Sequence, residues 1–199
     1  MSTQQQRILK MALCGGNAVG KSSIGARLAR QEPDLEHNPT IGVDYFARRL
    51  PAYNAKIGIW DLAGDRRFDT ITTPYITGTT IILFVYDITR CESVMELRRL
   101  HSLYKKVRNL EKVNIIVVGN KMDKGPSAYT TCVDRGKTFA IELSAPHVEI
   151  SAKTGQGLEE LLSVIIRETN LEKVERDLMT DIKIMHNDSI RTCRNCLIS

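Results

Sequence analysis

The segment Gly15 to Ser22 reads GGNAVGKS and fits the phosphate-binding pattern G-x-x-x-x-G-K-[ST]. Glycines let the backbone N–H groups of such a loop turn toward a phosphate, and the N-terminus of the following helix favours an anion. Lys21 is expected to reach the terminal phosphates, and the Ser22 hydroxyl to bind Mg2+. The residues assigned to a nucleotide here are Gly15, Gly16, Asn17, Ala18, Val19, Gly20, Lys21, Ser22 and Ser23. A glycine turn capped by serine is the alternative, and the motif alone does not choose ATP or GTP.

A second motif, Asp61-Leu62-Ala63-Gly64, closes an apolar stretch. The Asp61 carboxylate can hold Mg2+ through water, and Gly64 can offer its N–H to the γ-phosphate. D-x-x-G is weak on its own, because an acidic residue before a turn is common. Its position after a predicted hairpin favours the phosphate interpretation.

The segment Asn120-Lys121-Met122-Asp123 decides the base. The Asp123 carboxylate can accept hydrogen bonds from two N–H groups of guanine, whereas adenine would leave it unpaired. The stem of Lys121 can lie over the base. Downstream, Ser151-Ala152-Lys153 can supply a backbone N–H for the guanine O6. These residues predict a guanine nucleotide, and they disfavour a P-loop ATPase or kinase.

The elements that must position these motifs alternate along the chain. Strands are expected at 7–14, 45–48, 55–61, 80–87, 113–120 and 147–151, and helices at 21–30, 94–107 and 158–166. The runs at 80–87 and 113–120 are apolar on both faces, as in the middle of a covered sheet. This order predicts an α/β fold with a mostly parallel sheet and a site at the carboxyl ends of its strands.

Composition narrows the class of protein. The 199 residues carry a formal charge of +5, with Lys and Arg spread along the chain, so no nucleic acid is expected as a partner. No apolar run is long enough to span a bilayer, and residues 1–6 lack the apolar stretch of a signal peptide. Five scattered cysteines predict reduced thiols in the cytosol. The spacing of Cys193 and Cys196 resembles a zinc knuckle, but no second pair completes it.

Together the four motifs resemble the Ras superfamily of small GTPases, over about 7–166, and the Rab family in particular. The Rab-like segments are 40–45, 59–61, 68–75 and 84–89. The resemblance implies a P-loop GTPase fold, with a six-stranded, mostly parallel sheet and helices on both faces. It also implies a GTP/GDP switch that acts as a monomer. It assigns Thr40 to Mg2+ and the γ-phosphate, so that the metal ligands are Ser22, Thr40 and Asp61. It also implies an effector surface at Tyr45, Trp60 and Tyr75, with core aromatics as the alternative.

The chain departs from the family at three places. Asp65 stands where the family usually has the glutamine that orients the attacking water, so the catalytic set becomes Lys21, Thr40, Gly64 and Asp65. Asn17 occupies a position that is small in many relatives. The stretch 31–38 lacks the aromatic that usually covers the guanine. We expect slow hydrolysis, and a scaffold that binds GTP but hardly turns it over is the alternative.

The last residues, Cys196-Leu197-Ile198-Ser199, fit C-a-a-X with the farnesyl preference. One lipid binds a membrane only marginally, so Cys193 is expected to carry a second. Many Rabs instead carry two prenylated cysteines, so the sequence does not decide which prenyltransferase acts. Residues 1–6 are expected as an N-terminal extension, 7–177 as the GTPase domain and 178–199 as a flexible tail.

By the resemblance, the protein regulates vesicle transport from the cytosolic face of an intracellular membrane that the sequence does not identify. The partners that it implies are an exchange factor, a GAP, effectors, a prenyltransferase and a dissociation-inhibitor-type chaperone.

Overall fold

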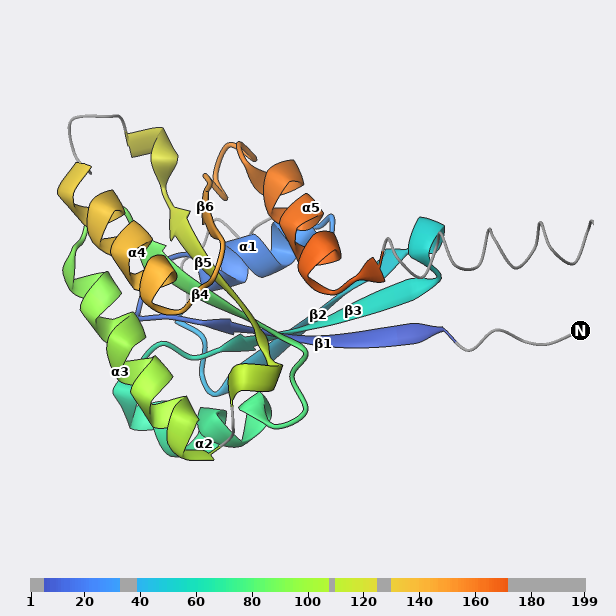
Figure 1. Cartoon of the computed structure of the whole chain (residues 1–199), viewed down its shortest axis with the longest axis horizontal. Coiled ribbons are helices and arrows are strands. Elements are labelled where there is room, and N and C mark those ends of the chain that lie inside the picture. Colours follow the sequence, from blue (N-terminus) through green and yellow to red (C-terminus); the bar gives the residue numbers. More distant parts are fainter. Residues whose placement is uncertain (1–5, 33–38, 108–109, 125–129, 172–199) are drawn as a thin grey trace, which may run out of the picture.

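A computed structural model describes residues 6–32, 39–107, 110–124 and 130–171. Its centre is one six-stranded sheet with the strand order β2-β3-β1-β4-β5-β6 (Figure 1). The strands are β1 (Arg7–Cys14), β2 (Val43–Leu50), β3 (Ala55–Leu62), β4 (Ile81–Asp87), β5 (Asn114–Asn120) and β6 (His147–Glu149). Only the β2–β3 pair is antiparallel, as expected of a hairpin. The predicted six-stranded, mostly parallel α/β sheet is confirmed.

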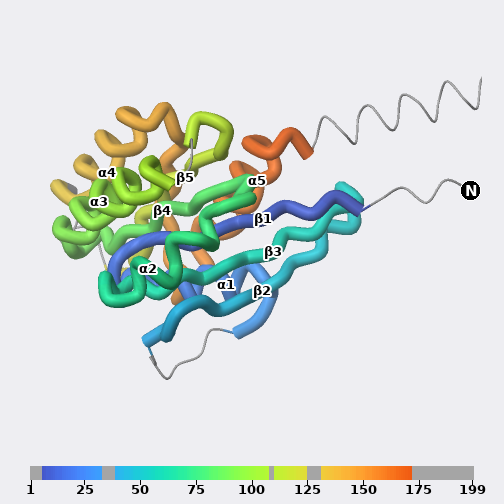
Figure 2. The backbone as a smooth tube through the Cα atoms, turned by 90° about the horizontal axis from the view of Figure 1, so that it is seen from below, coloured from blue at the N-terminus to red at the C-terminus, as the bar shows by residue number. Residues whose placement is uncertain are grey.

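Helices cover both faces of the sheet (Figures 1 and 2). The helices α1 (Lys21–Leu28) and α5 (Leu158–Glu168) lie on one face, and α3 (Glu92–Val107) and α4 (Thr130–Glu142) on the other. The short helix α2 (Asp69–Thr72) lies beside α3, joined to it by an ion pair between Arg99 and Asp69. Short 3-10 turns occupy Pro51–Tyr53, Arg66–Phe68, Thr73–Ile76, Leu110–Lys112 and Met122–Lys124.

The core divides into two clusters because successive strand residues point to opposite faces. In β1, Leu9, Met11 and Leu13 pack under α1 and α5, while Ala12 and Cys14 face α3 and α4. Every residue of β4 is buried. The near-continuous apolar run that predicted a central strand therefore serves both clusters at once.

The helix α4 was not predicted, although its sequence carries a signal. Its buried residues, Cys132, Val133, Gly136, Phe139 and Ala140, recur at helical spacing. Gly136 weakens that signal, because glycine is unfavourable inside a helix. It is needed there, since a Cβ would lie 2.3 Å from the ring of buried Tyr86. The bounds of the strands and helices that were predicted all hold to within two residues.

The prediction of reduced cysteines is wrong for one pair. Cys91 and Cys132 form a disulfide, with their Cα atoms 4.7 Å apart. The two residues are 41 positions apart, and only the side-by-side packing of α3 and α4 brings them together, so spacing could not reveal the bond. Cys14 is a buried free thiol. Cys193 and Cys196 lie outside the described residues.

Within the part of the chain that is described, no helix is long and apolar enough to cross a membrane.

Candidate functional site

The predicted motifs meet at one edge of the sheet. The phosphate-binding loop follows β1, Asp61 is the next-to-last residue of β3, Asn120 ends β5, and Ser151 follows β6. These are the carboxyl ends of parallel strands, where a doubly wound sheet places its ligand. The segments that sequence reasoning expected to cooperate are thus neighbours.

The phosphate-binding loop, residues 15–20, is held by side chains that bind its carbonyl groups. The bonds run from Lys21 Nζ to Gly16 O (2.9 Å), Arg90 Nη2 to Asn17 O (2.7 Å), Lys121 Nζ to Ala18 O (2.7 Å) and Asn120 Nδ2 to Val19 O (2.8 Å). With its carbonyls turned outward in this way, such a loop leaves its N–H groups to face an anion. Gly20, at φ +94°, lets Asn120 approach, because a Cβ there would lie 2.3 Å from its amide nitrogen.

Lys21 lies at the floor of the site. Burial lowers the pKa of its ammonium, and the charge of Asp61 partly offsets that effect. Gly64 lies against the same loop, since a Cβ on it would be 2.5 Å from the Gly16 carbonyl and 2.7 Å from Lys21 Nζ. The Lys21 ammonium and the backbone of Gly64 thus lie close together at the place expected for the γ-phosphate.

Ser22, Thr40 and Asp61 converge on one point. The Ser22 hydroxyl donates to Asp61 Oδ2 at 2.5 Å, Thr40 Oγ1 donates to the same oxygen at 3.3 Å, and the two hydroxyls are 3.1 Å apart. Burial raises the pKa of Asp61 despite its bonds to Ser22 and Thr40 and the nearby Lys21. Asp61 Oδ1 is buried and has no hydrogen-bond partner in the described chain.

This cluster fits Mg2+. The ion prefers oxygen ligands and keeps several waters, and a water on Mg2+ would give the unpartnered Asp61 oxygen a donor. When bound, the ion neutralises charge on the β- and γ-phosphates. No cluster of three or more His, Cys, Asp or Glu with metal-binding geometry occurs among the described residues.

The base-recognition side is held by Asn120 and Ser151. Ser151 Oγ donates to Asp123 Oδ1 at 2.7 Å, which fixes the carboxylate predicted to read guanine. Asn120 Oδ1 accepts from the Ala152 N–H at 3.0 Å. A guanine O6 would therefore share or replace that acceptor.

Lys121 joins the base side to the phosphate side. Its backbone has φ +79°, which is rare for a residue other than glycine. Besides bonding Ala18 O, its ammonium lies 2.7 Å from Asp87 Oδ2. Burial works to raise the pKa of Asp87, but bonds from Lys121 and Thr89 outweigh it and the pKa falls. Arg27 holds the last motif by donating to the carbonyls of Ala152 and Lys153 at 3.2 Å.

Two of these contacts were missed by sequence reasoning. Asp87 ends β4 at the carboxyl edge of the sheet, which is a usable signal that was not followed. Arg90 carried no signal, because its role appears only when the loop after β4 folds against the phosphate-binding loop.

A cleft of about 770 Å³ runs from the phosphate-binding loop toward β2, with Lys21, Ser22, Thr40, Asp44 and Gly64 in its wall. The predicted effector aromatics lie outside it. Tyr45 and Trp60 are in edge-to-face contact at 5.0 Å between ring centroids. Tyr75 is exposed and has no ring contact with either among the described residues. Of the stretch 31–38, where the missing aromatic was noted, residues 33–38 lie outside the described part.

The Asp65 carboxylate is bonded to Arg67. It accepts from the Arg67 backbone N–H at 2.9 Å and from Arg67 Nη2 at 2.7 Å. These bonds from Arg67 lower the pKa of Asp65 to about 2. In this arrangement Asp65 begins the turn Arg66–Phe68 as an N-terminal cap, so its oxygens are occupied by a neighbour.

A model of the Ras family matches residues 10–171. The chain belongs to the Ras family. Its relatives include the Ras-related protein Rab-31 of Rattus norvegicus, 34% identical over 96% of this chain and 97% of the relative. The Ras-related protein RABE1e of Arabidopsis thaliana is 33% identical over 92% of this chain and 85% of the relative. The GTP-binding protein ypt2 of Schizosaccharomyces pombe is 33% identical over 89% of both chains.

The predicted resemblance to small GTPases, and to Rab proteins among them, is confirmed. Members of the Ras family bind GTP and GDP with Mg2+ and hydrolyse GTP. Identity to these Rab-like relatives extends well beyond the motifs, since it covers most of both chains.

Proposed function

We propose that this Rab-like protein is a GTP/GDP switch that regulates vesicle transport on an intracellular membrane and hydrolyses GTP slowly. The observation that carries the proposal is the convergence of Lys21, the Ser22–Thr40–Asp61 cluster and the Asp123 loop at one edge of the sheet. A phosphate site, a magnesium site and a guanine site are thereby joined in one continuous region.

We assign the nucleotide to the residues predicted for it. The phosphates contact residues 15–23 with Thr40 and Gly64, and the base contacts Asn120, Lys121, Asp123 and residues 151–153. Ser22 and Thr40 bind Mg2+, and Asp61 holds it through water. The G domain spans 7–177. This assignment is supported by the hydrogen bonds that already preorganise each segment.

The switching step follows from Thr40 and Gly64. Both are positioned by contacts to the γ-phosphate and its metal in the GTP state, so loss of that phosphate removes what holds their loops. Effectors then recognise the ordered loops through Tyr45, Trp60 and Tyr75. The exposed fractions of Tyr45 and Tyr75, 49% and 40%, suit a surface that awaits a partner.

The regulators and the membrane anchor are carried over from the family. We propose an exchange factor, a GAP, a prenyltransferase and a dissociation-inhibitor-type chaperone as partners, with lipids on Cys196 and Cys193. The location that follows is the cytosolic face of an intracellular membrane.

Nucleotide competition tests the proposal most directly. The purified chain, loaded with fluorescent GDP in Mg2+, should release it when excess GTP is added but not when ATP is added. Displacement by ATP at similar concentrations would contradict the base assignment. Phosphate release in a single turnover then measures hydrolysis.

The second candidate function is a scaffold that binds GTP and hardly turns it over. The closed Asp65–Arg67 pair favours it, because no glutamine amide is present to orient water. A purified Rab-type GAP separates the two: strong stimulation indicates a switch, and none indicates a scaffold.

A further inference from the structure

The loop between β4 and α3, residues 87–93, contacts the phosphate-binding loop through one side chain. Arg90 Nη2 donates to the Asn17 carbonyl at 2.7 Å, and Arg90 Nε lies 3.3 Å from Asp87 Oδ2. Of the four carbonyl-binding groups described above, Lys21, Asn120 and Lys121 belong to the nucleotide motifs. Arg90 does not, so it adds a support that the motifs do not provide.

Asp87 links this support to the base side. Its Oδ2 atom is shared by Arg90 and Lys121, while its Oδ1 atom accepts from the Thr89 backbone and hydroxyl. The Asp87 side chain is only 3% exposed, whereas that of Arg90 is 48% exposed. A displacement of Arg90 therefore removes one donor to Asn17 and disturbs the carboxylate that also holds Lys121.

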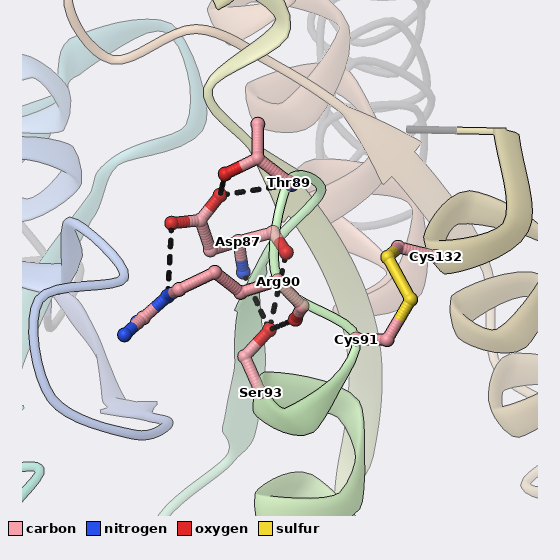
Figure 3. Close-up of a disulfide and its surroundings, with 6 residues drawn as sticks. All are labelled: Asp87, Thr89, Arg90, Cys91, Ser93 and Cys132. Carbon is pink, nitrogen blue, oxygen red and sulfur yellow. Dashed lines mark hydrogen bonds and ion pairs between the residues drawn. A yellow bond between two sulfur atoms is a disulfide. The ribbon is translucent and has the colours of Figure 1, made fainter. Parts of the chain in front are cut away.

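The disulfide begins one residue after Arg90. Figure 3 shows Arg90 extending from one side of the loop and the Cys91–Cys132 bond leaving from the other, toward α4. Ser93 also closes the loop, by accepting from the Asp87 N–H at 3.0 Å and donating to Arg90 O at 2.5 Å. Ser93, however, ties the loop only to itself, whereas the disulfide ties it to a different helix.

Arg90 has room to leave its position. It lines a hollow of about 490 Å³ between the phosphate-binding loop, Asp65 and α3. A half-exposed arginine beside open space is held by its bonds and by the backbone that carries it, not by packing. The anchoring of residue 91 should thus affect how long Arg90 stays on Asn17.

We propose that Arg90 is a positioning residue for the phosphate-binding loop and that the Cys91–Cys132 disulfide holds it there, so that reducing the disulfide speeds nucleotide release. The inference rests on the proposed guanine-nucleotide binding. It adds a redox input to that site.

Reduction proceeds by thiol–disulfide exchange with a dithiol. Cys91 is the more accessible residue of the pair, since it is half-buried and Cys132 is only 6% exposed. A thiolate of the dithiol therefore attacks Cys91 Sγ, and Cys132 leaves as a thiolate. The second thiol of the dithiol then attacks the mixed disulfide and releases Cys91. Two electrons pass from the dithiol to the protein disulfide, two protons end on the protein thiols, and the dithiol becomes a disulfide.

The test uses the full chain with Cys193→Ser and Cys196→Ser, which leaves the 91–132 pair and buried Cys14. The protein is kept oxidised with glutathione disulfide or reduced with dithiothreitol, and the state is verified by mass after alkylation. The dissociation rate of fluorescent GDP is measured in excess Mg2+. We expect release to be roughly three- to tenfold faster after reduction, the range for one charge-assisted hydrogen bond at a half-exposed site.

Two sets of variants identify the route. Cys91→Ser with Cys132→Ser should release GDP at the reduced rate in both buffers. Arg90→Ala should release it fast in both buffers, because the disulfide then has no side chain to position, and Arg90→Lys should restore part of the redox response. Equal rates for the oxidised and reduced parent, or a full redox response in Arg90→Ala, would overturn the proposal.

Arg98→Ala is the matched control. Arg98 also joins α3 to α4, by a paired contact to Glu142, but touches no nucleotide motif. It should lower the melting temperature without changing GDP release or its redox response. A change in release equal to that of Arg90→Ala would mean general loosening of α3 and would refute a specific role for Arg90. A parent that binds no guanine nucleotide in either buffer overturns the proposed function itself, and this inference with it.

Discussion

Asp65 and Arg67 form a closed pair beside the place where the attacking water would lie. The carboxylate bonds both the backbone and the guanidinium of Arg67, two residues away. Catalysis of phosphoryl transfer depends mainly on positioning and on charge stabilisation. A carboxylate contributes neither here, because it carries the wrong charge and is already occupied.

Asp65→Gln should therefore speed intrinsic GTP hydrolysis. A glutamine amide is one methylene longer and can donate as well as accept, so it can orient water without adding negative charge. GAP-stimulated hydrolysis should change much less. The measurement is single-turnover phosphate release.

Arg67→Ala is the control, since it opens the pair but leaves the carboxylate, and it should not accelerate the reaction. An Asp65→Gln protein no faster than its parent would shift the cause of slow turnover to Asn17 or to the stretch 31–38, which lacks the aromatic that usually covers the guanine.

Asp123→Ala should weaken GDP binding by roughly 2–4 kcal/mol, because guanine N–H groups lose a charged acceptor. Ser151→Ala removes the hydroxyl that orients this carboxylate and that also accepts from the Thr154 N–H, and it should cost about 1 kcal/mol. Asp134→Ala, an exposed acid on α4, should leave affinity unchanged. Titration with fluorescent GDP measures all three, and parental affinity in Asp123→Ala would remove the case for guanine.

At the scale of elements, α4 depends on a residue that helices disfavour. Gly136 faces the Tyr86 ring, whose hydroxyl lies 2.9 Å from His147 Nε2. Tyr86 is fully buried and cannot move aside freely. The helix gives up intrinsic stability so that it can pack closely on β4.

Gly136→Ala should accordingly destabilise the protein by roughly 1–3 kcal/mol through overpacking, although alanine is the better helix former. Thr138→Ala, on the exposed side of the same helix, should be neutral or slightly stabilising. Urea unfolding followed by circular dichroism gives both values. A stabilised Gly136→Ala protein would show that the Tyr86 contact can relax.

The sequence predicted the strands and the motifs after them, because apolar runs and Gly-Lys-Ser or Asn-Lys-x-Asp patterns are local signals. It did not predict what depends on packing between distant segments. Gly136 concealed α4, and the Cys91–Cys132 bond and the Arg90–Asn17 contact arise only when α3, α4 and the phosphate-binding loop come together. The orientation of Asp65 was missed for a related reason, since Arg67 competes for it within the folded turn.

At the scale of the whole molecule, the proposed lipids on Cys196 and Cys193 would hold the GTPase domain at a membrane. Cys196→Ser should leave the protein in the soluble fraction of cells, because prenylation is lost. Cys193→Ser should give weak, reversible association, because a single chain is a marginal anchor. Fractionation of a tagged chain with a free C-terminus measures both, and a Cys196→Ser protein that still sediments with membranes contradicts the lipid-anchor hypothesis.

The division of the core into two clusters makes one more prediction. Ile57 on β3 packs in the cluster under α1 and α5, and Ile82 on β4 in the cluster under α3 and α4. Each substitution by valine should cost about 0.5–1.5 kcal/mol. Because β1 separates the two strands and the two side chains belong to different clusters, the double variant should lose the sum to within about 0.5 kcal/mol. A larger deviation in chemical unfolding would show that the two clusters are coupled.

The sheet thus works as a partition between two interiors. A mutation on one side meets a different set of neighbours from a mutation on the other, so compensating changes have to arise on the same side. Over evolutionary time we therefore expect the interior under α1 and α5 to change in sequence independently of the interior under α3 and α4. The strand backbones belong to both interiors, so substitutions on either side must preserve the same strand geometry.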